Sequence, residues 1–335
     1  MTIRWGIIGC GDVTEVKSGP GFQKTEGSEL VAVMRRTGSL AQDYARRHGV
    51  PKWYGNADAL INDSQVDAIY VATPPGSHLE YALKIAAAGK ACHMEKPMAR
   101  SFAECRQMVD AFARAKRPIF VAYYRRAQPR FVKLKELIDS GRIGRITGCR
   151  YRMTKFYMAD PKPEWRLDAE QSGGGLLLDV GSHAIDIMDF LLGEFVEFSG
   201  TAHTTGATKV EDNVSLSFRT NTGVIGSASW NFAGPTKDEI FEIEGTQGKI
   251  TTQILQHSPL VIQAGEKTET LEFPDLQHVA QPLIKQVVDD LLGKGKCSST
   301  GQAGARASKV MDAALSSFYN GRDDEFWKRP QTWRK

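Results

Sequence analysis

The chain has 335 residues, which is long for a single hydrophobic core, so its length favours two domains. Apolar residues make up 41% of the chain and charged residues 24%, a composition that excludes a disordered or fibrous protein. The formal net charge is +4 with both signs interspersed, so charge gives no reason to expect a nucleic-acid or membrane partner.

The apolar runs and the cysteines indicate where the protein works. No apolar run is long enough to span a bilayer, and glycines interrupt the first run before it could serve as a secretion signal. The five cysteines are scattered and form no C-x-x-C pair, which favours reduced thiols over a disulfide frame or a structural zinc site. We therefore expect a soluble, cytoplasmic protein without a metal ion.

Strand-like apolar runs alternate with helical segments through residues 1–123. This order predicts a Rossmann fold, which is a doubly wound parallel sheet with right-handed crossovers and helices on both faces. Ligands of such sheets bind at the carboxyl ends of the strands, so the loops that follow the strands carry the candidate site. The expected strands are 3–9, 29–34, 67–73, 91–94 and 118–123, and the expected helices are 39–49, 78–89 and 101–115.

The first of these loops reads GCGDVT and has the pattern of a dinucleotide-binding turn. Gly9 suits a tight turn, and Gly11 lets the backbone approach a pyrophosphate. The pyrophosphate would lie on the N-terminus of the next helix, and Asp12 and Val13 are also candidate cofactor contacts. The third position of the fingerprint holds Thr14 instead of glycine or alanine, a departure that weakens the match.

The second strand ends in Arg35 and Arg36, with no carboxylate beside them. About 20 residues past the glycine loop, an acidic residue would bind the ribose hydroxyls of NAD, whereas an arginine accommodates the 2′-phosphate of NADP. We therefore expect NADP(H) in preference to NAD(H). The competing interpretation is two solvated side chains at the end of a strand.

The third strand runs into ATPPGSH, where two prolines favour an extended backbone. Such a loop can pass beneath a ribose of the cofactor, so Thr73, Pro74 and His78 are candidate cofactor contacts. His78 is also open to a structural interpretation, as a buried histidine with satisfied ring nitrogens.

The fourth strand ends in MEKPMA, which places Glu95 and Lys96 at the same edge of the sheet. Both are candidate cofactor contacts. Alone, the motif favours a solvated lysine at a strand end, with Pro97 stopping the strand.

The pattern changes after residue 123, which divides the chain into a cofactor domain, 1–123, and a substrate-binding and oligomerisation domain, 124–335. Alternating runs separated by glycine turns predict an antiparallel meander over 195–273. The other expected elements are helices at 130–141, around 179–183, near 279–292 and near 302–320, a strand at 145–157 and a polar loop at 158–175.

Asp179 and His183 are four residues apart and would share one face of a helix. They fit a structural pair in which the aspartate holds a buried histidine. They also fit part of a metal site, although no further ligand stands at a suitable spacing. In the third interpretation, His183 transfers the proton of a substrate hydroxyl while Asp179 orients it.

The glycine loop, ATPPGSH, EKPMA and GGGLLLDVGSHAIDIMDFLLG occur here in an order and spacing that resemble the Gfo/Idh/MocA oxidoreductase family. The resemblance extends over nearly the whole chain. It implies a Rossmann domain followed by an α/β domain with a large, mostly antiparallel sheet. One side of that sheet would carry the substrate, and the other would join subunits into a homodimer or homotetramer.

The resemblance also implies hydride transfer between a nicotinamide and a sugar, cyclitol or related compound. Lys96 would contact the substrate hydroxyl as a catalytic residue together with Asp179 and His183, while Glu95 places the loop. The Lys96–Pro97 bond would be cis. The expected substrate contacts are Tyr124, Arg152, Trp165, Arg166, Asp179 and His183.

The sequence thus predicts an NADP(H)-dependent oxidoreductase acting on a hydroxyl or ketone carbon of a sugar, anhydrosugar or cyclitol. A dehydrogenase of aromatic trans-dihydrodiols remains an alternative within the enzyme class. A non-enzymatic NADP-sensing regulator and a metal-dependent lyase or hydrolase are alternatives from other classes.

Overall fold

The computed structural model describes residues 1–155 and 164–334 and divides into two compact units. Part of the polar loop expected at 158–175, and the end of the strand expected at 145–157, lie outside the described residues. The first unit comprises Met1–Ala99, Glu104–Gln128 and Leu276–Ala305, and the second comprises Arg100–Ala103, Pro129–Asp275 and Arg306–Lys335.

The first unit contains a six-stranded parallel sheet in the order β3-β2-β1-β4-β5-β6. The inner strands β4 and β5 are buried along their whole length, because helices cover both faces of a doubly wound sheet. The predicted Rossmann fold is confirmed. The strands are β1 (Ile3–Ile8), β2 (Ser28–Met34), β3 (Lys52–Tyr54), β4 (Ala68–Val71), β5 (Ala91–Met94) and β6 (Ile119–Val121).

One helix from late in the chain packs in the first unit. Val287 and Val288 of α10 belong to the same buried cluster as Trp5 of β1 and Tyr44 of α3. The sequence division at residue 123 would assign this helix to the second domain. Its contacts instead assign it to the first unit, since its apolar side completes the core of the parallel sheet. The helices of this unit are α1 (Asp12–Val16), α2 (Gly19–Lys24), α3 (Gly38–His48), α4 (Ala57–Ile61), α5 (His78–Ala87), α6 (Phe102–Ala115) and α10 (Gln281–Leu291).

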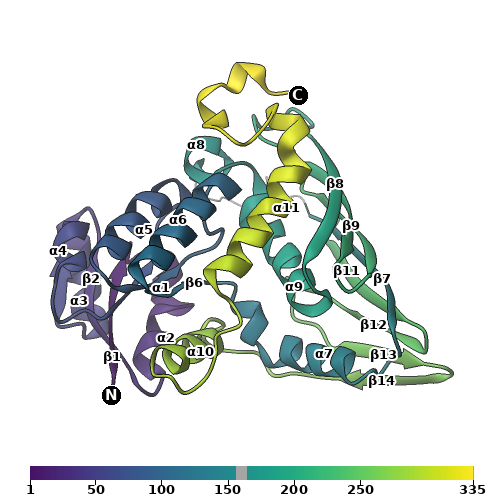
Figure 1. Cartoon of the computed structure of the whole chain (residues 1–335), viewed down its shortest axis with the longest axis horizontal. Helices are drawn as coiled ribbons and strands as arrows, with labels where there is room; N and C mark the ends of the chain where they lie inside the picture. The colour runs from purple at the N-terminus through teal and green to yellow at the C-terminus, as the bar shows by residue number, and fades with distance from the viewer. Residues whose placement is uncertain (156–163, 335) are drawn as a thin grey trace. The chain divides into compact units, whose positions relative to one another are not determined.

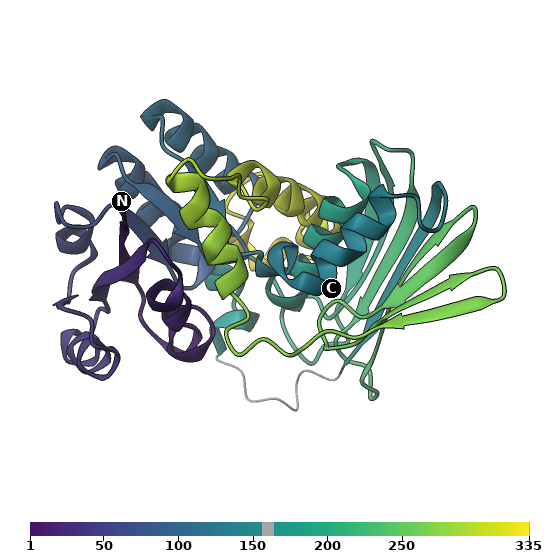
Figure 2. The ribbon, with the colours of Figure 1, turned by 90° about the horizontal axis from the view of Figure 1, so that it is seen from below.

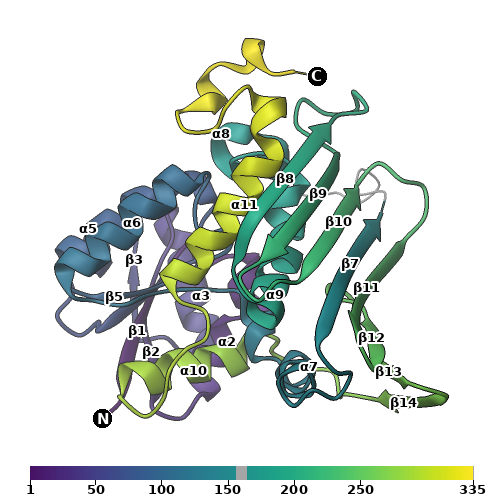
Figure 3. The same ribbon diagram turned by 45° about the vertical axis from the view of Figure 1, so that its right-hand side comes forward.

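The second unit is built on an eight-stranded sheet in the order β14-β13-β12-β11-β7-β10-β9-β8, which can be followed in Figure 3. Its pairs are antiparallel except β10 with β7, which run parallel. A meander alone would not produce that pair, because β7 enters the sheet between β10 and β11. The strands are β7 (Ile146–Thr154), β8 (Phe195–His203), β9 (Asn213–Thr220), β10 (Ile225–Asn231), β11 (Asp238–Gly245), β12 (Gly248–Thr252), β13 (Leu260–Ala264) and β14 (Lys267–Leu271).

One face of the second sheet is covered by helices, and Figure 2 shows the other face bare. Tyr151 and Met153 of β7 are buried on the covered face, whereas Arg150 and Arg152 alternate onto the bare one. None of the described helices is both long and apolar enough to cross a membrane. The remaining helices are α7 (Pro129–Asp139), α8 (Ala169–Ser172), α9 (Ser182–Leu192) and α11 (Gly301–Tyr319), with short turns η1 (Pro75–Ser77), η2 (Tyr124–Ala127), η4 (Glu164–Leu167), η5 (Leu177–Gly181), η6 (Phe326–Lys328) and η7 (Pro330–Thr332).

Candidate functional site

The loops with cofactor candidates meet at one edge of the parallel sheet. Each strand end is joined to its neighbour by a backbone hydrogen bond, so the loops after β1, β4 and β5 start side by side. The bonds are Gly9 N–H to Met34 O at 2.9 Å, Ala72 N–H to Ile8 O at 2.8 Å, and Glu95 N–H to Val71 O at 2.9 Å.

The two glycines of the first loop differ in the space around them. Gly9 has φ +90°, and a Cβ there would lie 2.8 Å from Thr73 Cγ2 and 3.0 Å from the Ala72 backbone, so the turn admits no side chain. At Gly11, by contrast, a Cβ would meet no protein atom closer than the Gly9 oxygen at 3.9 Å. The chain itself does not need glycine at position 11. The open space there fits the close approach of a dinucleotide phosphate to the backbone.

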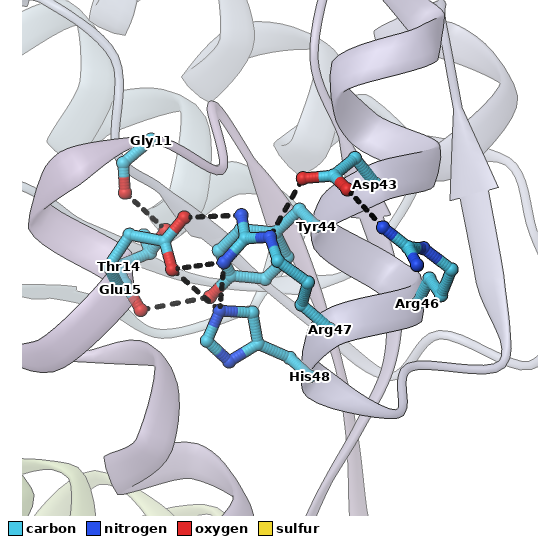
Figure 4. Close-up of polar contacts among 8 residues, drawn as sticks. All are labelled: Gly11, Thr14, Glu15, Asp43, Tyr44, Arg46, Arg47 and His48. Carbon is cyan, nitrogen blue, oxygen red and sulfur yellow. Dashed lines mark hydrogen bonds and ion pairs between the residues drawn. The ribbon is translucent and has the colours of Figure 1, made fainter.

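Thr14 replaces the third glycine of the fingerprint and is fully buried. Its hydroxyl donates to the Gly11 carbonyl (2.7 Å), and its own carbonyl accepts from the Tyr44 hydroxyl (2.9 Å) (Figure 4). The next residue, Glu15, accepts both Nη atoms of Arg47 at 2.7 and 2.8 Å. These contacts fasten the glycine loop to α3, so threonine supports the turn here instead of loosening it.

The positive charges of the two strand-end arginines, Arg35 and Arg36, affect the pKa values of different residues. Both side chains are exposed. Burial raises the pKa of the Cys10 thiol to about 11, and the positive charge of Arg35 opposes that rise, so Arg35 acts on the glycine loop. Arg36 instead opposes the burial-raised pKa of Tyr81 on α5. Of the two, Arg35 is therefore the one whose charge reaches the glycine loop.

His78 ties two strand-end loops together and has no ring nitrogen left for a cofactor. It is fully buried, with Nε2 2.8 Å from the Thr73 oxygen and Nδ1 3.1 Å from the Met98 oxygen. Burial lowers its pKa, against the opposing effect of these carbonyls. Its interpretation as a cofactor contact is thus corrected. Thr73 and Pro74 remain on the partly exposed side of the loop.

Glu95 is fixed from two sides beside Lys96. Its carboxylate accepts the hydroxyl of Tyr70 from β4 and, at 3.0 Å, the backbone N–H of Lys96. Burial raises the pKa of Glu95, although the Lys96 charge and the Tyr70 hydroxyl lower it. Burial likewise raises the pKa of Tyr70 well above its usual value, so its hydroxyl keeps the proton it donates. The Lys96–Pro97 bond is cis, as expected.

Asp179 and His183 lie in different helical elements of the second unit. Asp179 is in η5, a turn of π-helix, and His183 is in the first turn of α9, so the expected single α-helix is replaced by a π-to-α junction. Such π-turns are frequent at functional sites. Asp179 Oδ2 accepts Arg166 Nε at 3.0 Å, and the Arg166 guanidinium stacks on Trp165 at 4.4 Å from the ring centroid. The structure thus joins Trp165, Arg166 and Asp179 by direct contacts, and His183 lies at the start of the helix that follows.

The segment before Asp179 rests on a carboxylate that sequence reasoning missed. Glu211, 1% exposed, accepts the Gly175 N–H at 2.9 Å and the hydroxyl of Tyr319. Burial raises its pKa. No local pattern connects Gly175, Glu211 and Tyr319, because they come from a loop, the strand entry before β9 and the end of α11.

Two other substrate candidates have separate positions. Arg152 is on the bare face of the second sheet and forms an ion pair with Asp238 (Nη2 to Oδ2, 2.6 Å), whereas η5 packs on the face that carries Trp230. This position corrects the interpretation of Arg152 as a substrate contact, which the strict alternation of β7 could have excluded. Tyr124 is in η2 of the first unit, with its hydroxyl 3.1 Å from Arg125 Nη1.

Two family profiles match this chain. The profile described as oxidoreductase family, NAD-binding Rossmann fold, matches residues 3–123. The GFO/IDH/MocA C-terminal domain matches residues 131–251. The chain is therefore an oxidoreductase whose residues 3–123 form an NAD-binding Rossmann fold.

Individual relatives cover most of the chain. Oxidoreductase P35 of Formosa agariphila is 38% identical over 315 residues, which are 92% of this chain and 97% of that protein. The 1,5-anhydro-D-fructose reductase of Ensifer adhaerens is 29% identical over 90% of this chain and 92% of that protein. A solved levoglucosan dehydrogenase in complex with NADH and levoglucosan aligns with a TM-score of 0.85 at 24% identity, over 95% of this chain and 97% of that one, and so shares the fold.

Proposed function

The chain belongs to the Gfo/Idh/MocA family of oxidoreductases, and from this premise we propose that it transfers hydride between NADP(H) and a hydroxyl or ketone carbon of a sugar, anhydrosugar or cyclitol. One observation carries the proposal: Lys96 follows the end of β5 at the sheet edge that also holds the glycine loop. The name of the anhydrofructose reductase relative supports the substrate class.

The residues have the chemistry that the reaction needs. When bound, the nicotinamide donates or accepts the hydride. Negative charge then develops on, or leaves, the substrate oxygen, and the Lys96 ammonium would stabilise that charge. His183 would hold or release the hydroxyl proton. Asp179, anchored by Arg166, would orient the imidazole or a neighbouring hydroxyl.

Arg166 and Trp165 suit a polyhydroxylated ring. Arg166 Nη1 is buried and has no hydrogen-bond acceptor among the described residues, although Nε is bound to Asp179. A substrate hydroxyl would supply that acceptor, and the Trp165 ring would cover an apolar face of the sugar.

NADP(H) is the proposed cofactor because Arg35 and Arg36 stand where NAD sites carry an acid. The test compares dissociation constants for NADPH and NADH by fluorescence titration. We expect tighter NADPH binding, and loss of that preference in the Arg35→Ala plus Arg36→Ala protein. Equal constants in the unmodified protein would contradict the proposal.

The division of labour and the assembly are also proposed. Residues 1–123 would bind the cofactor, and 124–335 would bind the substrate and join subunits. The bare sheet face offers a flat polar surface for a second copy, with Ser199, Ser217, Ser227 and Arg150 side by side across four strands. Light scattering should give a dimer or tetramer. The five cysteines, all free and buried, fit a cytoplasmic protein.

A substrate screen tests the function directly. The absorbance of NADPH at about 340 nm follows NADPH oxidation and NADP reduction. The compounds tested are aldoses, ketoses, anhydrosugars, inositols and aromatic trans-dihydrodiols. Turnover of a sugar-like compound supports the proposal, and turnover of dihydrodiols alone would favour the alternative within the enzyme class. NADPH binding without turnover of any compound would favour a regulator.

A further inference from the structure

The two segments that flank the proposed catalytic residues are joined by one buried network in the second unit. Arg100–Ala103 begins four residues after Lys96, and Gly173–Gly175 ends four residues before Asp179. We infer that Tyr319 and Arg322, at the end of α11, are positioning residues that hold these two segments in register. The inference rests on the proposed function.

The sequence around Tyr319 turns the chain back onto these segments. Helix α11 ends at Tyr319, and Asn320 and Gly321 follow with φ of +56° and +97°. The Gly321 N–H closes the helix on the Ser316 oxygen at 2.8 Å, which is the geometry of a glycine-type helix end. Arg322 is thereby directed back inside and is only 2% exposed. Figure 1 shows the chain after α11 lying against α8, just before Gly173.

Arg322 fastens the segment that follows Lys96. Its Nη2 donates to the Arg100 carbonyl at 2.9 Å, and its Nε donates to Asp312 Oδ1 at 2.7 Å. The other oxygen of Asp312 accepts the Phe102 N–H at 2.7 Å. The segment is thus held at two backbone points by one buried ion pair.

Tyr319 fastens the segment that precedes Asp179. Its hydroxyl donates to Glu211, and the other carboxylate oxygen of Glu211 accepts the Gly175 N–H at 2.9 Å. Glycine is required along this run: a Cβ at Gly175 would lie 2.4 Å from the Glu211 carbonyl oxygen, and one at Gly174 3.2 Å from the Tyr319 hydroxyl.

The two fastened segments also touch each other, which closes the network into a ring. A Cβ at Gly173, where φ is +86°, would lie 2.5 Å from the Arg100 carbonyl oxygen. The Arg322 guanidinium lies 4.9 Å from the Tyr319 ring centroid and 4.1 Å from that of Phe326. A shift of either segment therefore disturbs the other through Arg322 and Tyr319.

The chain offers a matched control for the test. Tyr151 also donates its hydroxyl to a buried glutamate, Glu239, at 3.1 Å. Glu239 accepts the N–H groups of Ile254 and Leu255, in a loop without any candidate site residue. Tyr151→Phe and Tyr319→Phe thus delete the same hydroxyl from the same kind of pair.

The experiment measures turnover and amide hydrogen exchange in both variants of the full chain. We expect Tyr319→Phe to lower kcat by about tenfold, because small displacements of catalytic groups are costly, with the NADPH dissociation constant unchanged. Exchange over residues 174–183 should accelerate in this variant alone. Tyr151→Phe should keep kcat within about twofold of the unmodified protein while its exchange accelerates near 254–256.

Further variants separate positioning from folding. Glu211→Gln keeps an acceptor for the Gly175 N–H and should retain more turnover than Glu211→Leu, and Arg322→Lys more than Arg322→Met. Equal kcat values for Tyr319→Phe and Tyr151→Phe, or unchanged exchange at 174–183, would overturn the inference. If the unmodified protein turns over no compound, the proposed function fails, and the exchange result still decides whether Tyr319 holds this segment.

Discussion

Each unit has a tyrosine–glutamate pair next to its own proposed catalytic residues, but the two pairs are built differently. In the first unit, Tyr70 and Glu95 are 25 residues apart and come from adjacent parallel strands. In the second, Tyr319 and Glu211 are 108 residues apart. Glu95 is half-buried and bonds the N–H of its own neighbour, Lys96, whereas Glu211 is 1% exposed and reaches across to Gly175.

In both pairs one glutamate accepts a tyrosine hydroxyl and a backbone N–H. The same arrangement thus holds a strand-end loop in the first unit and a segment between helical elements in the second. A strand-end loop is already placed by its sheet, so a local carboxylate needs only to orient the last turn. The segment before Asp179 lies between α8 and the π-turn η5, and no strand fixes it. A distant, fully desolvated carboxylate therefore takes over that role, and its loss leaves two polar groups unsatisfied where solvent does not reach them.

The largest effect should come from removing the groups that the two pairs would serve. Lys96→Met and His183→Ala should each lower kcat by about 10²- to 10⁴-fold, the usual contribution of a positioned proton donor or cation. NADPH binding, measured by fluorescence titration, should persist. Retained turnover in both variants would mean that neither tyrosine–glutamate pair positions a catalytic residue.

The next effect compares the carboxylates themselves. Glu95→Leu and Glu211→Leu each leave a tyrosine hydroxyl and a backbone N–H without their acceptor, which costs about 1–3 kcal/mol in the free energy of unfolding. We expect the larger loss for Glu211→Leu, because solvent can reach the half-buried Glu95 site. Urea denaturation of both proteins checks the order, and a larger loss for Glu95→Leu would reverse the comparison.

A smaller effect should appear in the pH dependence of Glu95. Its pKa is raised above the value of an unfolded chain, near 4.3, so the folded protein keeps this proton to a higher pH. That contribution to stability is full below the unfolded pKa and is lost as pH rises through the folded one. The unmodified protein should lose stability relative to Glu95→Gln as pH rises above about 4.3. Denaturation midpoints of both proteins, measured between about pH 4 and 7, test this trend. A gain in the stability of the unmodified protein relative to Glu95→Gln with rising pH would contradict it.

The smallest effect belongs to Glu15, a more exposed carboxylate whose pKa is shifted in the opposite direction to that of Glu95. Its hydrogen bonds to Arg47 lower its pKa to about 2, so its stabilisation is present above the unfolded pKa and is lost as pH falls through the folded one. Glu15→Gln should cost less than about 1 kcal/mol at neutral pH, because solvent screens the ion pair. That cost should shrink in denaturation measurements as pH falls towards 2. A cost that grows on acidification would contradict this assignment.

Local patterns predicted the parallel half of the fold better than the short elements within it. The five expected strands of residues 1–123 are present, and so are the helices α3, α5 and α6. The short elements β3, α2 and α4 were not predicted, because three to six residues carry too little periodicity. At the site, the loops after β1 and β5 could be located from glycine, lysine and proline at strand ends.

Other positions needed the three-dimensional structure. His78 belongs to the ATPPGSH motif, yet its ring nitrogens are occupied by the Thr73 and Met98 carbonyls, which no sequence pattern specifies. Asp179 and His183 have helical spacing, but Asp179 lies in a π-turn and His183 in the α-helix that follows it. Arg152 is the exception, since the alternation of β7 could have assigned it to the bare face from the sequence.

By itself, the sequence determined the family, the parallel sheet and the edge where Lys96 lies, because strand periodicity and strand-end motifs are local properties of the chain. Only the tertiary structure decided that α10 completes the core of the first unit. It also decided that Tyr319, Glu211 and Arg322 hold the segments around the proposed site. Those contacts join residues far apart in the chain, and their pairing depends on how helices and strands pack, which no local pattern records.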